Sequence, residues 1–272
     1  MSATNTPTRR FSSIVNAGAA DSRRWLILAI ICFAALMIVL DVTVMNLALP
    51  SAQRALGFTN ADRQWIVTAY SLSFGSLLLF GGRLADLIGR KVIFLTGLAG
   101  FAAASAIGGA SVSFTMLVTA RACQGVFAAL LAPSALSLLT TTFTDPKERG
   151  KAYGVYGAVA ASGSGLGLLI GGALTSYASW RWCMYINLVF AAIAIIGGTL
   201  LLGRQPKTPG ARLDVPGVAA VSGGMFCLVY GFSNAATHSW HAASTWGFLA
   251  AAENMRPLPK PVTMSGPSRD DA

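Results

Sequence analysis

A short polar stretch separates two long apolar runs in the first third of this chain: Gly82-Arg83-Leu84-Ala85-Asp86-Leu87-Ile88-Gly89-Arg90-Lys91. Asp86 has basic residues on both sides, and such charges are stable at a lipid–water boundary but costly at the centre of a bilayer. The flanking apolar runs each approach the ~20 residues that a helix needs to cross a membrane. We therefore predict that the stretch is a short loop between two membrane-spanning helices.

The composition of the whole chain agrees with a membrane location. Of its 272 residues 11% are charged and 54% are hydrophobic, and the mean hydropathy is +0.60, whereas soluble domains carry about 25% charged residues. The formal net charge is +10, but the Lys and Arg residues are scattered between apolar segments and form no basic face. We predict a multi-pass protein whose partner is the lipid bilayer and which binds no nucleic acid.

The residues that usually carry enzyme or metal chemistry form no such pattern. Cys32, Cys123, Cys183 and Cys227 all lie inside apolar runs, without the spacing of a metal site or a disulfide framework. No apolar segment carries a pair of carboxylates, or a nucleophile with a nearby base. We therefore expect neither an enzyme nor a metal or other cofactor.

Seven apolar runs have the length of a membrane span. The first begins at Trp25 and lasts about 25 residues. The others are 64–81, 92–110, 114–139, 152–177, 183–203 and 216–233. The predicted division is a tail at 1–24, a six-helix bundle at 25–204, a loop at 205–215, a seventh helix at 216–233, and a loop and tail at 234–272. An apolar segment after Ser244 suggests the start of an eighth helix, but it is too short to span, and the proline-rich tail behind it is expected to be disordered.

The connections between the spans predict the orientation. Lys and Arg accumulate on the cytoplasmic side of membrane proteins. If the N-terminus lies inside the cell, three basic residues lie outside: Arg54, Arg63 and Arg181. Thirteen lie inside: Arg9, Arg10, Arg23, Arg24, Arg83, Arg90, Lys91, Lys147, Arg149, Lys151, Arg204, Lys207 and Arg212. We predict a cell-membrane protein with a cytoplasmic N-terminus.

Two charged residues fall inside predicted spans. Asp41 lies in the outer half of the first span, where a buried carboxylate tends to keep its proton unless it is paired, which suits proton exchange. Arg121 lies inside the fourth span and must face a cavity or a partner. Because Asp41 is the one acidic residue inside any predicted span, the two form a natural pair. The alternatives are a structural salt bridge, or an aspartate at the interface with a structural role.

The fifth span is rich in glycine. Gly163, Gly167 and Gly171 recur every four residues, which leaves one helix face without side chains and allows close approach by a neighbour. This face either packs two helices together or forms a seam along which they move. At the start of the sixth span, Trp180 and Trp182 are typical of an interfacial aromatic belt. Asn187 either caps that helix or forms hydrogen bonds within the bundle.

Together these residues resemble motifs of the major facilitator superfamily, in particular of its fourteen-helix drug:proton antiporter branch. The matching positions are Asp41 to Pro50, Gly82, Leu84, Asp86, Gly89, Arg90, Lys91, Arg121, Gln124, Gly125, Gly163, Gly167, Gly171, Gly172, Trp180 to Trp182, Ile186 and Asn187. The chain departs from the pattern at Leu87, where a basic residue is usual, and at Leu168 and Val189, where proline is usual. The likeness covers about residues 25–233.

The resemblance implies an all-α membrane fold: the N-terminal six-helix bundle of that family, a seventh helix and a truncated tail. It implies proton coupling by Asp41 and Arg121, a glycine face that seals the seam between two bundles, and polar cavity residues at Asn46, Gln124 and Asn187. A cytoplasmic gate is implied at Gly82, Asp86, Gly89, Arg90 and Lys91, and the packing motif is Gly163, Gly167, Gly171 and Gly172.

The activity implied by the resemblance is proton-coupled export of small molecules, cationic or amphipathic, by alternating access of two bundles. The proton gradient would supply the energy, with no cofactor. Because the chain has seven predicted spans where that branch has fourteen helices, the alternatives are a truncated remnant that does not transport, or a half-transporter that needs a partner. We expect the 272-residue chain to confer no drug resistance by itself.

Overall fold

The computed structural model describes residues 7–203, 215–237 and 243–254, and every element in these ranges is a helix. This confirms the predicted all-α class. The helices are α1 Pro7–Leu56, α2 Asn60–Ile88, α3 Arg90–Gly109, α4 Phe114–Thr142, α5 Pro146–Tyr177, α6 Trp182–Leu201, α7 Val215–Thr237 and α8 Ala243–Asn254.

Several helices begin at a side chain that caps them. Thr59 and Asp62 form a reciprocal capping box at the start of α2. Ser113 caps α4, and Asp145 accepts hydrogen bonds from the backbone N–H groups of Lys147 and Glu148 at the start of α5. Each cap satisfies backbone donors that have no partner within the first turn of a helix.

Six helical stretches are long and apolar enough to cross a membrane: Ser22–Leu56, Asn60–Ile88, Arg90–Gly109, Phe114–Thr142, Pro146–Tyr177 and Trp182–Leu201. They correspond to the six helices of the predicted bundle. The predicted seventh span is present as a helix, α7, and its crossing of the membrane stays a prediction.

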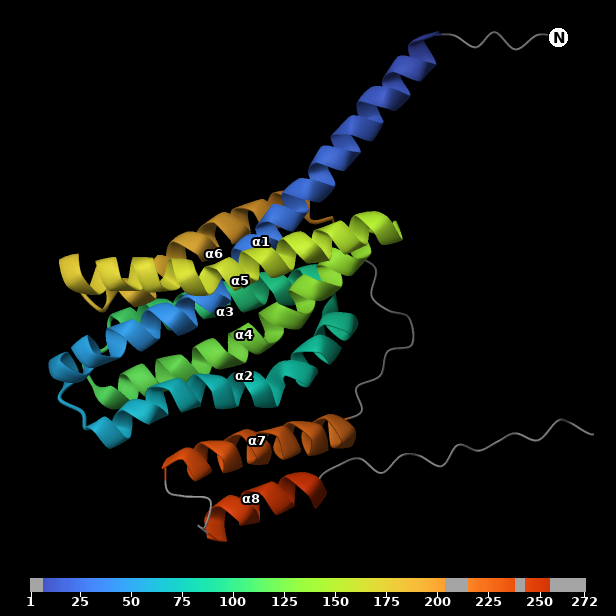
Figure 1. Ribbon diagram of the computed structural model, residues 1–272. Coiled ribbons are helices and arrows are strands. Elements are labelled where there is room, and N and C mark those ends of the chain that lie inside the picture. Colours follow the sequence, from blue (N-terminus) through green and yellow to red (C-terminus); the bar gives the residue numbers. More distant parts are fainter. Residues whose placement is uncertain (1–6, 204–214, 238–242, 255–272) are drawn as a thin grey trace, which may run out of the picture.

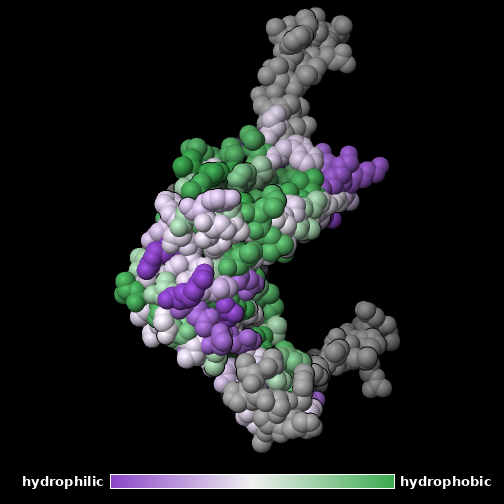
Figure 2. All heavy atoms as spheres, turned by 60° about the vertical axis from the view of Figure 1, so that its left-hand side comes forward, coloured by the Kyte–Doolittle hydropathy of each residue, from purple (hydrophilic) through white to green (hydrophobic). Residues whose placement is uncertain are grey.

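The first six helices lie side by side as a bundle, α7 lies along the outside of α2, and α8 packs against α7 (Figure 1). Within the bundle α4 packs between α2 and α3, and α1 packs against α5 and α6. The first turns of α1 project beyond the bundle (Figure 1). Hydrophilic residues gather on the end that faces the viewer in Figure 2, and hydrophobic residues cover its flanks, as expected for a bundle that spans a lipid bilayer.

The polar stretch at 82–91 differs from the predicted loop. Helix α2 continues to Ile88, a single residue, Gly89, separates it from α3, and Arg90 already belongs to α3. Gly89 has a φ of 118°, a conformation that glycine adopts readily and other residues do not. The prediction failed because charged residues end an apolar run without ending a helix: once α2 leaves the lipid, Arg83 and Asp86 can be helical and hydrated.

The N-terminal end of the chain is more helical than predicted, because α1 begins at Pro7, inside the predicted tail. α8 covers the short apolar segment after Ser244 where the start of an eighth helix was predicted. The 12 residues of α8 rise about 18 Å, well short of a hydrocarbon core of about 30 Å. Packing of α8 against α7 accounts for its order. Residues 255–272 and most of the predicted loop, 205–214, lie outside the described residues.

Candidate functional site

A buried ion pair joins α1 to α4 near the centre of the bundle. The Nη1 atom of Arg121 lies 2.5 Å from Oδ2 of Asp41, and the two residues are 2% and 1% exposed. The structure thus brings together the two charged residues that the sequence placed inside spans. Removal of both charges from water is compensated only if every other polar atom nearby is also paired.

Two amide side chains complete the coordination of the carboxylate. Gln124 donates from Nε2 to Oδ1 of Asp41 at 3.0 Å, and Asn187 of α6 donates from Nδ2 to the same oxygen at 2.7 Å. Gln124 also accepts from Nη1 of Arg121 at 2.8 Å, because positions three apart share one face of α4. Ser105 of α3 accepts from Gln124 at 2.7 Å and from Asn187 at 3.3 Å.

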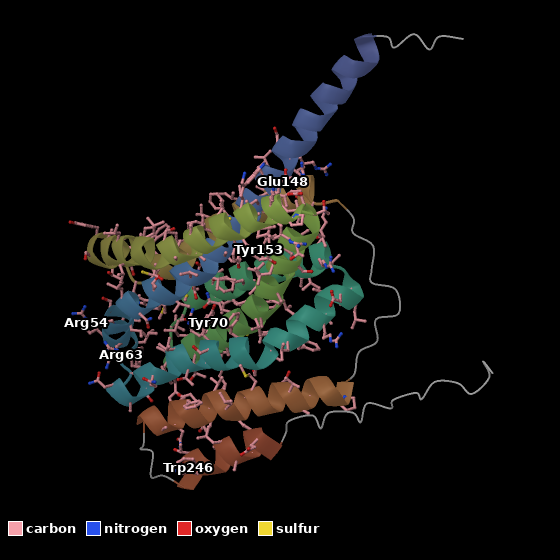
Figure 3. The ribbon with its side chains drawn as sticks, turned by 45° about the vertical axis from the view of Figure 1, so that its right-hand side comes forward. Arg54, Arg63, Tyr70, Glu148, Tyr153 and Trp246 are labelled. Carbon is pink, nitrogen blue, oxygen red and sulfur yellow. The ribbon has the colours of Figure 1, made fainter. Side chains whose placement is uncertain are left out.

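Tyr70 of α2 lies under the arginine. The guanidinium carbon of Arg121 lies 4.4 Å from the centroid of the Tyr70 ring, a cation–π contact. Figure 3 shows Tyr70 within the bundle, whereas Arg54 and Arg63 lie at the end where α1 stops and α2 starts. Five helices therefore contribute to this cluster, which we call the Asp41 network: Asp41, Tyr70, Ser105, Arg121, Gln124 and Asn187.

Three buried atoms of the network have no hydrogen-bond partner among the described residues: Nε of Arg121, Oδ1 of Asn187 and the hydroxyl of Tyr70. Such unpaired groups are costly in a stable core. The unpaired acceptor on Asn187 matters chemically, because a protonated Asp41 would become a donor and would need an acceptor nearby.

Four of the six residues of the Asp41 network were predicted from the sequence as site residues. Asp41, Arg121, Gln124 and Asn187 meet as a cluster, but the fifth polar candidate, Asn46, is exposed and outside the network. Ser105 and Tyr70 were missed. A serine inside a span and a tyrosine beside an arginine are weak signals, since the sequence alone does not show which helix faces meet.

The glycine face of α5 packs against α1. A Cβ atom on Gly167 would lie 1.8 Å from the hydroxyl oxygen of Thr43, and one on Gly163 or Gly171 would lie 3.1 Å from atoms of α1. Gly172 has nothing within 4 Å of such an atom, so it is not part of this contact. The expected close approach is present inside the bundle, between α1 and α5, and a role of these glycines at a seam with a second bundle stays a prediction.

The residues of the implied gate divide into two groups. Asp86 lies 3.7 Å from Arg90 across the break between α2 and α3. Lys91 instead donates to the carbonyl of Thr199 at 3.0 Å, and also to that of Leu202, at the end of α6. A cation at this position stabilises the unpaired carbonyls of a helix end. Lys91 therefore ties α3 to α6 and does not contact Asp86.

A cavity opens beside Asp86. It has a volume of about 840 Å³ and lies between α2, α4 and α7. Its wall is largely apolar, with Phe74 and Pro133 among its residues, and Arg83, Asp86 and Ser137 supply its polar side chains. A cavity of this size can hold a small organic molecule that has an apolar body and a polar group.

Comparisons with known proteins agree with this architecture. The model of the family described as Major Facilitator Superfamily matches residues 31–256. The puromycin resistance protein pur8 of Streptomyces alboniger is 53% identical over 227 residues, which are 84% of this chain and 44% of the relative. The cephamycin export protein CmcT of Amycolatopsis lactamdurans is 40% identical over 219 residues, 80% of this chain and 45% of the relative.

Among solved structures, the human organic anion transporter MFSD10 (TETRAN) superposes with a TM-score of 0.61 at 17% sequence identity, over 82% of this chain and 59% of that one. At this identity the likeness shows the shared fold alone. The chain spans less than half the length of the two relatives described above.

Proposed function

The chain belongs to the major facilitator superfamily, a family of transporters and not of enzymes, and on that premise we propose that it forms the N-terminal bundle of a proton-coupled exporter of small molecules. The observation that carries the proposal is the buried pair of Asp41 and Arg121, held by amides from α4 and α6. We further propose a location in the cell membrane with the N-terminus in the cytoplasm, on the basis of the basic residues in the connections.

The Asp41 network can respond to a proton. When Asp41 is charged, it accepts hydrogen bonds from Arg121, Gln124 and Asn187. When it is protonated, its attraction for Arg121 falls and its hydroxyl needs an acceptor, which the unpaired Oδ1 of Asn187 supplies after a rotation of the amide. Proton binding would therefore exchange contacts among α1, α4 and α6.

The contact between α1 and α5 links a change in the hydrogen bonds of Asp41 to a movement of α1. Asp41 is on α1, and Thr43 of the same helix lies against Gly167 of α5. A face without side chains lets the backbones of two helices approach closely, so α1 and α5 are in direct contact beside Asp41. We propose that a change at Asp41 shifts α1 along α5, as one step of alternating access.

The substrate class rests on the relatives and on the cavity. The two relatives are named for puromycin resistance and cephamycin export, which supports export of small organic molecules. The largely apolar cavity with Arg83 and Asp86 in its wall supports an amphipathic substrate, and Asp86 is the group that would attract a cationic one.

Alternating access requires two bundles that rock against each other, and the described bundle is one of them. We therefore propose that transport requires a second bundle. A second candidate function is a half-transporter that works with a separate partner, because the described residues form one bundle and rocking of two bundles needs another. A remnant that does not transport is the remaining alternative.

The test joins residues 1–233 to the C-terminal part of the Streptomyces alboniger relative and reconstitutes the joined protein in liposomes. We expect an imposed proton gradient to drive puromycin movement, and a protonophore to abolish it. Movement at the same rate with and without the gradient would contradict proton coupling. Absence of any movement in a folded joined protein would favour the remnant.

A further inference from the structure

A second cavity lies between α2 and α7, at the end of the bundle where α2 begins. Its volume is about 450 Å³, within the range of small-molecule sites. From α2 its wall includes the amide side chains of Asn60 and Gln64, the indole of Trp65 and the hydroxyl of Thr68. No residue of the Asp41 network lines it, so it is a separate feature of the molecule.

The wall from α7 has the same chemical character. Tyr230 contributes an aromatic ring that lies 6.3 Å from that of Trp65, and Ser233 and Asn234 contribute a hydroxyl and an amide. The hydroxyls of Thr68 and Ser233 lie 3.0 Å apart and join the two helices by a hydrogen bond. A tryptophan near a membrane surface is by itself common, but here it shares a cavity with a second ring and several hydrogen-bonding groups.

Helix α8 fixes this wall in place. Phe248 packs edge-on against Tyr230 with the ring centroids 4.6 Å apart. Asn234 donates from Nδ2 to the hydroxyls of Ser244 and Thr245 at 2.8 and 3.0 Å. Two residues that line the cavity are thus held by the helix that is too short to span a membrane. A wall held in this way loses little conformational freedom when a ligand binds.

The residues that line the cavity define the class of ligand. None of them is charged, so an ionic ligand would lose its hydration without gaining a counter-charge. The amides and hydroxyls suit several neutral hydroxyl groups, and the exposed indole, with Trp65 at 45% exposure, suits a flat ring that stacks on it. A neutral aryl glycoside combines these two properties.

We propose that the cavity between α2 and α7 is a binding site for a neutral aryl glycoside, with the aromatic ring on Trp65 and Tyr230 and the sugar hydroxyls on the amide of Gln64 and its polar neighbours. The inference does not rest on the proposed transport function, because it uses neither Asp41 nor a proton gradient. It gives α7 and α8, together with the start of α2, a role in recognition that is separate from the Asp41 network.

The test measures binding of phenyl β-glucoside to the full 272-residue chain in lipid nanodiscs by isothermal titration calorimetry. Trp65→Leu is expected to weaken binding about tenfold, because it removes the stacking surface. Gln64→Leu, a change at an exposed position, is expected to weaken it about threefold to tenfold through the loss of hydrogen bonds. Trp182→Leu is the matched control, since that indole is 54% exposed at the start of α6 and does not line the cavity.

A second probe tests the predicted preference for a neutral ligand. Phenyl β-glucuronide has the same ring and nearly the same sugar but carries a carboxylate, and we expect it to bind at least tenfold more weakly than the glucoside, because none of the described residues that line the cavity is a cation. The proposal is overturned if the folded wild-type chain does not bind the glucoside, if Trp65→Leu binds it as well as Trp182→Leu does, or if the two probes bind equally.

Discussion

The charges of Asp41 and Arg121 are costly where they lie. Both side chains are almost fully buried, and their mutual attraction offsets the loss of hydration only while each keeps its partners. Well-packed apolar residues of similar size would often hold such a position at lower cost. The pair is therefore better explained by a function that needs a charge inside the bundle than by stability.

Removal of one partner should expose that cost. In Arg121→Leu the carboxylate of Asp41 is left buried without its cation, and we expect unfolding in detergent to become easier by about 3–5 kcal/mol. The double variant Asp41→Asn, Arg121→Leu removes both charges and should recover much of this loss. Thermal and denaturant unfolding, followed by fluorescence, measure both. Equal stability of the single and double variants would contradict a coupled pair.

Among single residues, the sequence predicted those that stand out as charges inside an apolar run. Asp41 and Arg121 are charges inside apolar runs, so they were visible without a structure. The hydrogen bonds from Ser105 and the ring of Tyr70 were not, because a serine or a tyrosine inside a span gives no sign of the helix it faces. Asn46 is exposed on α1 and lies outside the Asp41 network, and its place in a transport cavity stays a prediction.

Among the elements, the contact of α1 with α5 depends on glycines at particular positions. Gly167→Ala would bring a methyl group within 1.8 Å of the Thr43 hydroxyl, and we expect a loss of about 1–3 kcal/mol of stability. Gly165→Ala is the matched control on the same helix, because nothing lies within 4 Å of its added methyl group. Thermal unfolding in detergent compares the two.

A second substitution identifies the cause of that loss. Adding Thr43→Ala to Gly167→Ala removes the hydroxyl that the new methyl group would meet, and should recover part of the stability. If Gly165→Ala and Gly167→Ala destabilise the protein equally, the cost lies in the helix backbone of α5 and not in its packing against α1.

The break between α2 and α3 depends on Gly89 in a different way. An added methyl group would have free space, but the φ of 118° is strained for any residue with a side chain. We expect Gly89→Ala to cost about 1–3 kcal/mol of stability. Gly150→Ala on α5 is the control, because it has equal space in a helical conformation and should be neutral or slightly stabilising. If Gly89→Ala and Gly150→Ala unfold at the same temperature, the backbone at Gly89 is not strained by a side chain.

The break at Gly89 also shows why element boundaries were predicted less well than the elements. The sequence reveals where a helix leaves the lipid, because charges begin there, whereas the helix itself ends where backbone conformation changes, at Gly89. The start of an eighth helix after Ser244 was visible as a short apolar run, but its packing against α7 was not, because that contact is a tertiary effect.

For the molecule as a whole, the orientation in the membrane is directly testable. The two ends of the bundle carry Arg54 and Arg63 on one side and Glu148 on the other (Figure 3). In a background in which the four native cysteines are replaced, we expect Ala61→Cys to react with a membrane-impermeant maleimide on intact cells, and Gly150→Cys to react only after the cells are opened. The reverse pattern would overturn the proposed cytoplasmic N-terminus.

The bundle of six helices was predictable, since each helix carries its own apolar run and the connections are short. The packing of α7 against α2 and of α8 against α7 was not predictable, because their sequences do not show which surface they contact. The large cavity beside Asp86 and the smaller one at Trp65 both depend on that placement.

The central claim is that Asp41 couples a proton to transport, and one measurement tests it most directly. In the joined protein described above, Asp41→Asn keeps the size of the side chain and removes its exchangeable proton, while Asp62→Asn removes a carboxylate outside the network. Puromycin movement driven by an imposed proton gradient is followed in liposomes that contain equal amounts of folded protein. We predict that Asp41→Asn abolishes gradient-driven movement and Asp62→Asn retains it; gradient-driven movement by Asp41→Asn at the wild-type rate would contradict the account.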